Sequence, residues 1–131
     1  MSVETLTSKE SDFVSEKVFP NGFKLILHHM PQVDTIAGRV SVGAGSMYEF
    51  PHLAGSSHFI EHWIPGGTRN LLTYRDLEIS IESRGGELEE ETDYVWVAHM
   101  AKLPVEHREY LVPYLFEHVD KPRFRTRDFK R

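Results

Sequence analysis

The pattern of apolar and polar positions predicts short strands at the start of the chain. Residues 13–30 mix apolar and polar side chains in short stretches on both sides of Pro20-Asn21-Gly22. This pattern is typical of two strands joined by a tight turn. Residues 35–46 alternate apolar and polar positions and predict a third strand.

Two helices are predicted in the middle of the chain. Residues 54–64 are followed by Pro65-Gly66-Gly67, which ends a helix. Thr73 has Asp76 three residues later, which is the signature of an N-cap that opens a helix running to about Arg84.

The last third of the chain completes the predicted fold. Residues 87–103 are strand-like, with many aromatic and β-branched side chains. Residues 105–119 predict a third helix, although Pro113 is unfavourable inside one, and the basic residues 121–131 can begin a fourth. This order predicts an α+β domain, a mostly antiparallel sheet with helices packed on one face.

Composition narrows the function classes. The chain has 131 residues, of which 40% are hydrophobic and 27% charged, as expected for one ordinary globular domain. The net charge of -5 argues against a nucleic-acid partner. With no cysteine, disulfides and thiolate metal sites are excluded.

The N-terminal segment has no targeting signal that we can identify. Residues 1–13 are polar and acidic, unlike a secretory signal or a mitochondrial transit peptide, and we expect a flexible lead-in before a domain over residues 14–131. No apolar run reaches the length of a membrane span. Together with the absence of cysteine, these features favour an intracellular location.

The sequence SSHFIEHWIPGGT, residues 56–68, carries the candidate chemistry. On a helical wheel, His58, Glu61 and His62 fall within roughly 100° of arc. Two imidazoles one turn apart can reach one ion such as zinc, and a neighbouring carboxylate can move a proton. The opposite face is an apolar stripe, formed by Leu53, Phe59, Ile60, Trp63 and Ile64.

The alternative is a polar helix face without function. A motif this short arises by chance in on the order of a few per cent of such chains. The segregation of polar and apolar side chains, and the helix stop just after His62, favour metal binding. His99, His107 and His118 are isolated in the sequence and are interpreted as structural or surface residues.

The chain resembles the pitrilysin, insulinase and mitochondrial-processing-peptidase family of zinc metallopeptidases, the inverzincins. The resemblance rests on FPNGFKLILHHMP, VGAGSMYEFPHLAGSSHFIEHWIPGGT, IESRGGELEEETDYVWV and LVPYLFEHVDKPRF, which follow one another in the family's order. It implies that His58 and His62 ligate zinc and that Glu61 is the general base. The family's fold, a sheet with helices on one face, is the one predicted above.

Two departures from the family pattern affect the expected site. The family's third zinc ligand is a glutamate roughly 70–80 residues beyond the second histidine, outside this sequence. The domain is therefore expected to be incomplete, with Glu49, Glu117 or a member of residues 89–91 as possible substitutes. Glu89 and Glu90 replace the Asn-Ala pair that the family uses to bind substrate, and two carboxylates there favour basic peptides.

Three functional hypotheses follow. The first is a zinc-dependent metalloendopeptidase that acts on a peptide substrate, with residues 87–93 as an edge strand that aligns the peptide. The activity of this motif-bearing fragment alone is left open, because the third zinc ligand lies outside it. The second is a non-catalytic scaffold or partner subunit derived from the same fold. The third is an assembly, either a homo-oligomer or a complex in which a partner chain completes the domain.

Overall fold

The computed structural model describes residues 13–125, which belong to two compact units, Met1–Asp34 and Thr35–Arg131. The first unit holds an antiparallel hairpin of β1 (Val14–Val18) and β2 (Lys24–His28). Its turn is closed because the Asn21 side chain accepts a hydrogen bond from the Phe23 N–H and Gly22 adopts a φ of 84°. The predicted pair of strands and its turn are confirmed.

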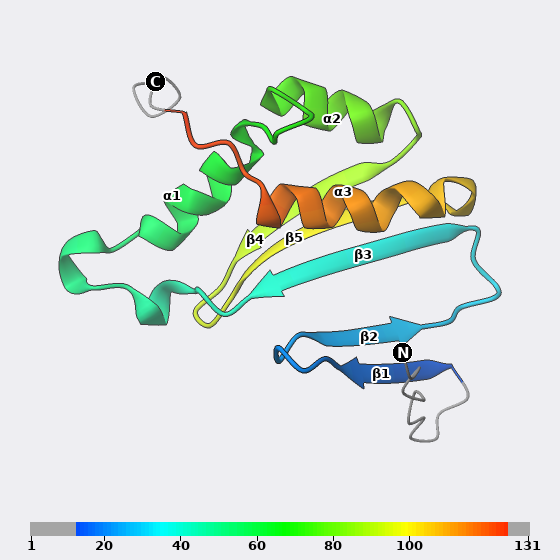
Figure 1. Cartoon of the computed structure of the whole chain (residues 1–131), viewed down its shortest axis with the longest axis horizontal. Helices are drawn as coiled ribbons and strands as arrows, with labels where there is room; N and C mark the ends of the chain where they lie inside the picture. The colour runs from blue at the N-terminus through cyan, green and yellow to red at the C-terminus, as the bar shows by residue number, and fades with distance from the viewer. Residues whose placement is uncertain (1–12, 126–131) are drawn as a thin grey trace. The chain divides into compact units, whose positions relative to one another are not determined.

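The second unit is built on a three-stranded antiparallel sheet with the strand order β3-β5-β4 (Figure 1). These strands are β3 (Thr35–Val42), β4 (Glu87–Thr92) and β5 (Val97–Pro104). The central strand β5 is buried along most of its length, whereas β4 alternates exposed and half-buried side chains. The sheet therefore has β4 at one edge.

Three helices pack against this sheet: α1 (Ser56–Trp63), α2 (Tyr74–Glu82) and α3 (Arg108–Asp120). The longest, α3, lies along β3 and β5 (Figure 1). Short 3-10 turns lie between the main elements at Ser46–Tyr48, Pro51–Leu53, Ile64–Gly66 and Val105–His107. The α+β fold with helices on one face of an antiparallel sheet is as predicted.

The hydrophobic core lies between the sheet and two of the helices. Side chains from α2, β5 and α3 form one buried cluster, which consists of Leu77, Ile81, Ala101, Leu103, Leu111, Tyr114 and Leu115. Helix α3 approaches β3 closely at Gly38, where a Cβ would lie 2.6 Å from Leu115 Cδ1. A side chain at Gly38 would therefore push α3 away from the sheet.

Helix α2 begins as predicted. The Thr73 hydroxyl accepts a hydrogen bond from the Asp76 N–H at 3.1 Å, and it donates one to the Asp76 carboxylate at 2.8 Å. These bonds satisfy a helix N–H that would otherwise lack a partner. The expected N-cap is confirmed.

The strand-like segment 87–103 forms a hairpin of two antiparallel strands, β4 and β5. Its turn lies between β4 and β5, where the Asp93 N–H donates to the Trp96 carbonyl at 2.8 Å. Tyr94 and Val95, whose residue types favour strands, are instead exposed at this turn. The local hydrogen bonds of Asp93 outweigh the strand propensity of its neighbours. The predicted lead-in and fourth helix lie mostly outside residues 13–125.

Pro113 lies inside α3 and is exposed, so the third predicted helix forms despite it. Within residues 13–125, no helix has the length and apolar character needed to cross a membrane.

Candidate metal centre

The loop that leads into α1 is fixed to the β4–β5 turn. The backbone N–H groups of Gly45, Ser46 and Met47 donate to carbonyls of the turn at 2.9–3.2 Å. A Cβ on Gly45 would lie 2.5 Å from backbone atoms of the turn, so only glycine allows this approach. The sequence thereby brings α1 beside β4.

Glu49 caps α1. Its carboxylate accepts hydrogen bonds from the backbone N–H groups of Gly55 and Ser57, both at 2.7 Å. The bond from Ser57, followed by that from Gly55, lowers the pKa of Glu49 below its ordinary value. Glu49 is not among the residues that could hold an ion with His58 and His62. The expectation that it might substitute as a ligand is therefore not supported.

The three motif side chains meet on one side of α1. Nε2 of His58 and Nε2 of His62 are 2.8 Å apart, and one ligand atom from each of His58, Glu61 and His62 lies within 4.8 Å of the others. A tetrahedral zinc site with bonds of about 2.0–2.1 Å separates its ligand atoms by about 3.3 Å. The two imidazoles therefore need to part by only a few tenths of an ångström to share an ion.

Glu61 is the buried member of this group. Its side chain is 4% exposed, and its carboxylate accepts a hydrogen bond from the Thr92 hydroxyl of β4. The two histidines are exposed. This arrangement holds the carboxylate in place while the imidazoles remain open to a ligand.

The apolar stripe of α1 differs from expectation. Leu53 and Ile60 are 49% and 42% exposed, whereas Ser57 and Glu61 are buried against the sheet side. In this chain α1 therefore turns much of its polar side inward. Helix geometry alone identified the two faces of α1 but could not show which of them packs against the sheet.

The motif side chains border an open cleft of about 670 Å³, which Glu49, Glu90 and Tyr94 also line. Glu89 and Glu90 are neighbours on β4 and so point to opposite faces of the sheet. Glu90 borders the cleft and Glu89 does not. The prediction that both bind substrate stays untested, and only Glu90 lies near the motif.

Glu117, another suggested substitute ligand, holds a loop. Its carboxylate accepts hydrogen bonds from the Thr68 hydroxyl at 2.6 Å and from the Asn70 side chain and N–H at 2.9 and 3.0 Å. Partial burial alone would raise the pKa of Glu117, but these bonds outweigh it and lower the pKa. Its role is to fix the segment after α1.

Sequence reasoning missed a second group of possible ligands. Glu90, His99 and His118, from β4, β5 and α3, also bring one ligand atom each within 4.8 Å of the others. His99 and His118, interpreted from the sequence as isolated, are thus neighbours. A prediction of the hairpin register would have brought Glu90 and His99 together, since these two residues are directly paired, but it would not have placed His118.

The fold and the motif together define an inverzincin-type metallopeptidase unit, with a His-x-x-Glu-His helix beside an edge strand. Residues 24–131 match the family described as Insulinase (Peptidase family M16). The chain belongs to this family, and the resemblance seen in the sequence is confirmed.

Individual relatives agree with this assignment. An uncharacterized zinc protease of Bacillus subtilis (strain 168) is 33% identical over 95 residues, which are 72% of this chain and 23% of the relative. A probable mitochondrial-processing peptidase subunit beta of Arabidopsis thaliana is 34% identical over 84 residues, 64% of this chain and 16% of the relative.

A solved structure supports the fold. The crystal structure of a protease from Helicobacter pylori matches 89% of this chain and 28% of its own with a TM-score of 0.82, at 17% identity. The chain spans less than a third of the length of that protease and less than a quarter of the two curated relatives.

Proposed function

We propose that this chain carries the zinc-binding and proton-transferring part of a zinc-dependent metalloendopeptidase. The observation that carries the proposal is the approach of His58 and His62 to 2.8 Å, with the buried carboxylate of Glu61 beside them. In this proposal the two imidazoles hold zinc. Glu61 is the general base.

The chemistry of the site follows from these positions. When bound, zinc would polarise the scissile carbonyl and make an attacking water more acidic. Glu61 takes a proton from this water and later gives it to the leaving amine. The hydrogen bond from Thr92 keeps the Glu61 carboxylate oriented for both transfers.

The third zinc ligand is proposed to come from elsewhere in the whole protein or from a partner chain. Among residues 13–125, Glu61 is the one further group within reach of both His58 and His62. Catalytic zinc sites use three protein ligands and leave one position open. The resemblance places the remaining ligand on a glutamate about 70–80 residues beyond His62.

A peptide substrate is proposed to lie along β4, the edge strand beside the cleft. Backbone hydrogen bonds to such an edge hold an extended peptide regardless of its sequence. The carboxylates of Glu89 and Glu90 on this strand then favour peptides with basic side chains.

The test is Glu61→Gln in the whole protein, assayed for peptide cleavage and for bound zinc. We expect cleavage to fall by at least about 100-fold, the usual contribution of a general base, while zinc is retained. Glu109→Gln, which changes an exposed carboxylate of α3, is the matched control and should cleave normally. Normal turnover by Glu61→Gln would reject the assigned role.

A second candidate is a non-catalytic subunit of a peptidase complex. Two observations favour it: the described residues offer no third ligand besides Glu61, and one relative is named as a subunit of a processing peptidase. Zinc bound to the whole protein, without cleavage in the presence of its partner, would support this candidate over the enzyme.

A further inference from the structure

We propose a second metal site, separate from the His58–His62 motif, in which the carboxylate of Glu90 and the imidazoles of His99 and His118 bind a divalent transition-metal ion. The three side chains come from β4, β5 and α3, so an ion here would tie the hairpin to the helix above it. Figure 1 shows α3 lying across the paired strands β4 and β5 in the second unit.

The backbone places the three side chains together. Glu90 and His99 are directly opposite in the β4–β5 register. His118 follows Leu111 and Leu115 at helical spacing on the buried side of α3, which lies against β5. The geometry therefore depends on the sheet register and on helix packing, not on flexible loops.

The distances suit a metal better than direct hydrogen bonds. Glu90 Oε1 lies 3.9 Å from His99 Nδ1 and 3.9 Å from His118 Nε2. Both separations exceed the length of an N–H···O hydrogen bond. Ligand atoms around a tetrahedral zinc are about 3.3 Å apart. Small shifts of the side chains would therefore bring one carboxylate oxygen and two ring nitrogens around an ion.

The two histidines are buried without hydrogen-bond partners among the described residues. His99 and His118 are each 2% exposed, and none of their four ring nitrogens has a hydrogen-bond partner among the described residues. Buried polar atoms in proteins are normally satisfied, so four unsatisfied nitrogens in one cluster call for a ligand. The two rings stack, with centroids 4.9 Å apart.

The environment keeps an imidazole in the form that binds metals. Burial, and then the nearby His99, lower the pKa of His118 to about 4, so this ring is neutral at neutral pH. Neutral imidazole nitrogen with one carboxylate oxygen is a donor set that suits zinc, cobalt or nickel.

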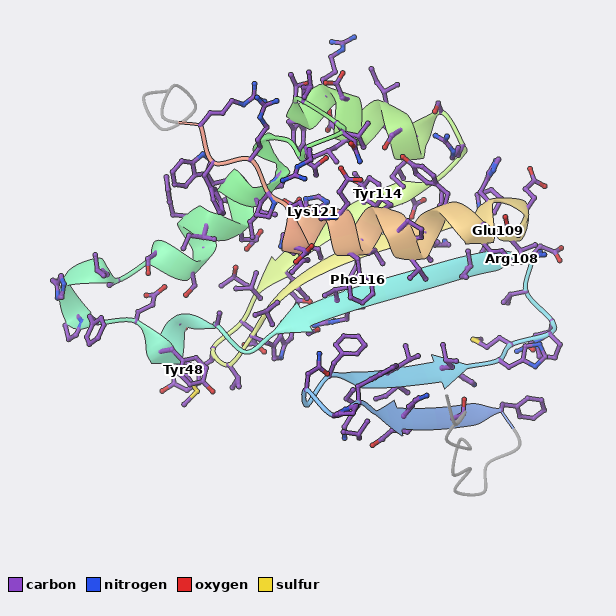
Figure 2. All side chains as sticks on the ribbon, in the orientation of Figure 1. Tyr48, Arg108, Glu109, Tyr114, Phe116 and Lys121 are labelled. Atoms are coloured by element: carbon purple, nitrogen blue, oxygen red, sulfur yellow. The ribbon has the colours of Figure 1, made fainter. Side chains whose placement is uncertain are left out.

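A fourth position remains for water or a protein hydroxyl. The hydroxyl of Tyr114 is also buried without a hydrogen-bond partner among the described residues, and its ring meets His118 edge-on. Figure 2 labels Tyr114 on α3, and His118 follows it four residues later in the same helix. On the other side, Glu90 borders the cleft, which gives an ion a route into the site.

The test uses the 131-residue chain with His58→Ala and His62→Ala, so that the motif cannot contribute. Cobalt(II) titration followed by its visible absorption, and zinc counted by mass spectrometry of the native protein, should both give one bound equivalent. Adding zinc should also raise the melting temperature. Adding Glu90→Gln should weaken binding by more than about 100-fold, since even partners outside the ligand shell cost 10–100-fold.

The matched control is Glu89→Gln in the same double-alanine background, because Glu89 lies on the opposite face of β4. It should bind cobalt and zinc like its parent. Circular dichroism checks folding, and if Glu90→Gln fails to fold, His118→Gln provides the same test. No bound equivalent in the double-alanine chain, or normal binding by folded Glu90→Gln, would overturn the proposal. Neither outcome bears on the Glu61 test above.

Discussion

At the scale of single residues, Glu49 shows how a carboxylate outside the proposed ligand set can support the motif helix. Its carboxylate accepts two backbone hydrogen bonds at the start of α1, and its pKa is lowered in the folded protein. A carboxylate whose pKa falls on folding stabilises the protein above its ordinary pKa. That contribution is lost as pH falls through the folded-state value.

We therefore predict a pH-dependent effect of Glu49→Gln. At neutral pH this variant should melt at a lower temperature than the natural sequence. The difference should shrink as the pH is lowered from 4.5, the ordinary value, through the lower folded-state pKa, because only below both values is Glu49 protonated in both states. Thermal unfolding at a series of pH values measures it, with Glu89→Gln as the control. A difference that stays constant down to the acid limit would contradict the capping role.

The sequence predicts which side chains meet when they all lie on one helix. The meeting of His58, Glu61 and His62 follows from helical spacing alone, because residues three and four apart are neighbours. The meeting of Glu90, His99 and His118 depends on a strand register and on the packing of α3, neither of which spacing reveals. Glu49 was visible only as a nearby acid, since its capping role depends on the path of residues 50–55.

At the scale of elements, the sequence located most helices and strands because their end signals are local. Thr73 and Gly85-Gly86 mark the ends of α2, and Pro20-Asn21-Gly22 marks the first turn. The position of the β4–β5 turn was not predicted because its residues favour strands. The turn forms there because Asp93 makes local hydrogen bonds to Tyr94 and Trp96. Local propensity is a weak guide where such bonds compete with it.

Helix α3 contains a proline that its packing tolerates. Pro113 is exposed and lies beyond the first turn of the helix, so it removes one backbone hydrogen bond and contributes no core contact. Proline inside a helix costs about 3 kcal/mol relative to alanine. Part of this is offset, by roughly 0.4–1 kcal/mol, because proline also restricts the unfolded chain.

We predict that Pro113→Ala raises the free energy of unfolding by about 2 kcal/mol. Pro113→Gly is the matched control. Its free energy of unfolding should lie between those of the natural chain and Pro113→Ala, since glycine is about 1 kcal/mol worse than alanine in a helix. Urea denaturation of the three chains gives the order. If proline proved the most stable of the three, α3 would depend on a bend at this position.

At the scale of the whole molecule, the apolar stripe at α1 is partly exposed. The helix buries Ser57 and Glu61, while Leu53 and Ile60 of the adjoining apolar stripe are 49% and 42% exposed. Exposed apolar side chains grouped on one surface are typical of a contact with other protein.

We predict that the 131-residue chain self-associates through this stripe. Leu53→Ser combined with Ile60→Ser should shift sedimentation and light scattering toward the monomer, because it removes apolar area that association would bury. The fold should persist, since substitutions at exposed positions change stability by about 0.5 kcal/mol each. Ile79→Ser on α2, where the side chain is 48% exposed, is the control and should leave association unchanged. A chain that is monomeric at every concentration, or that responds equally to Ile79→Ser, would show that the stripe on α1 does not drive association. In that case the apolar stripe would stay exposed to solvent, and the metal motif on the other side of α1 would not depend on self-association.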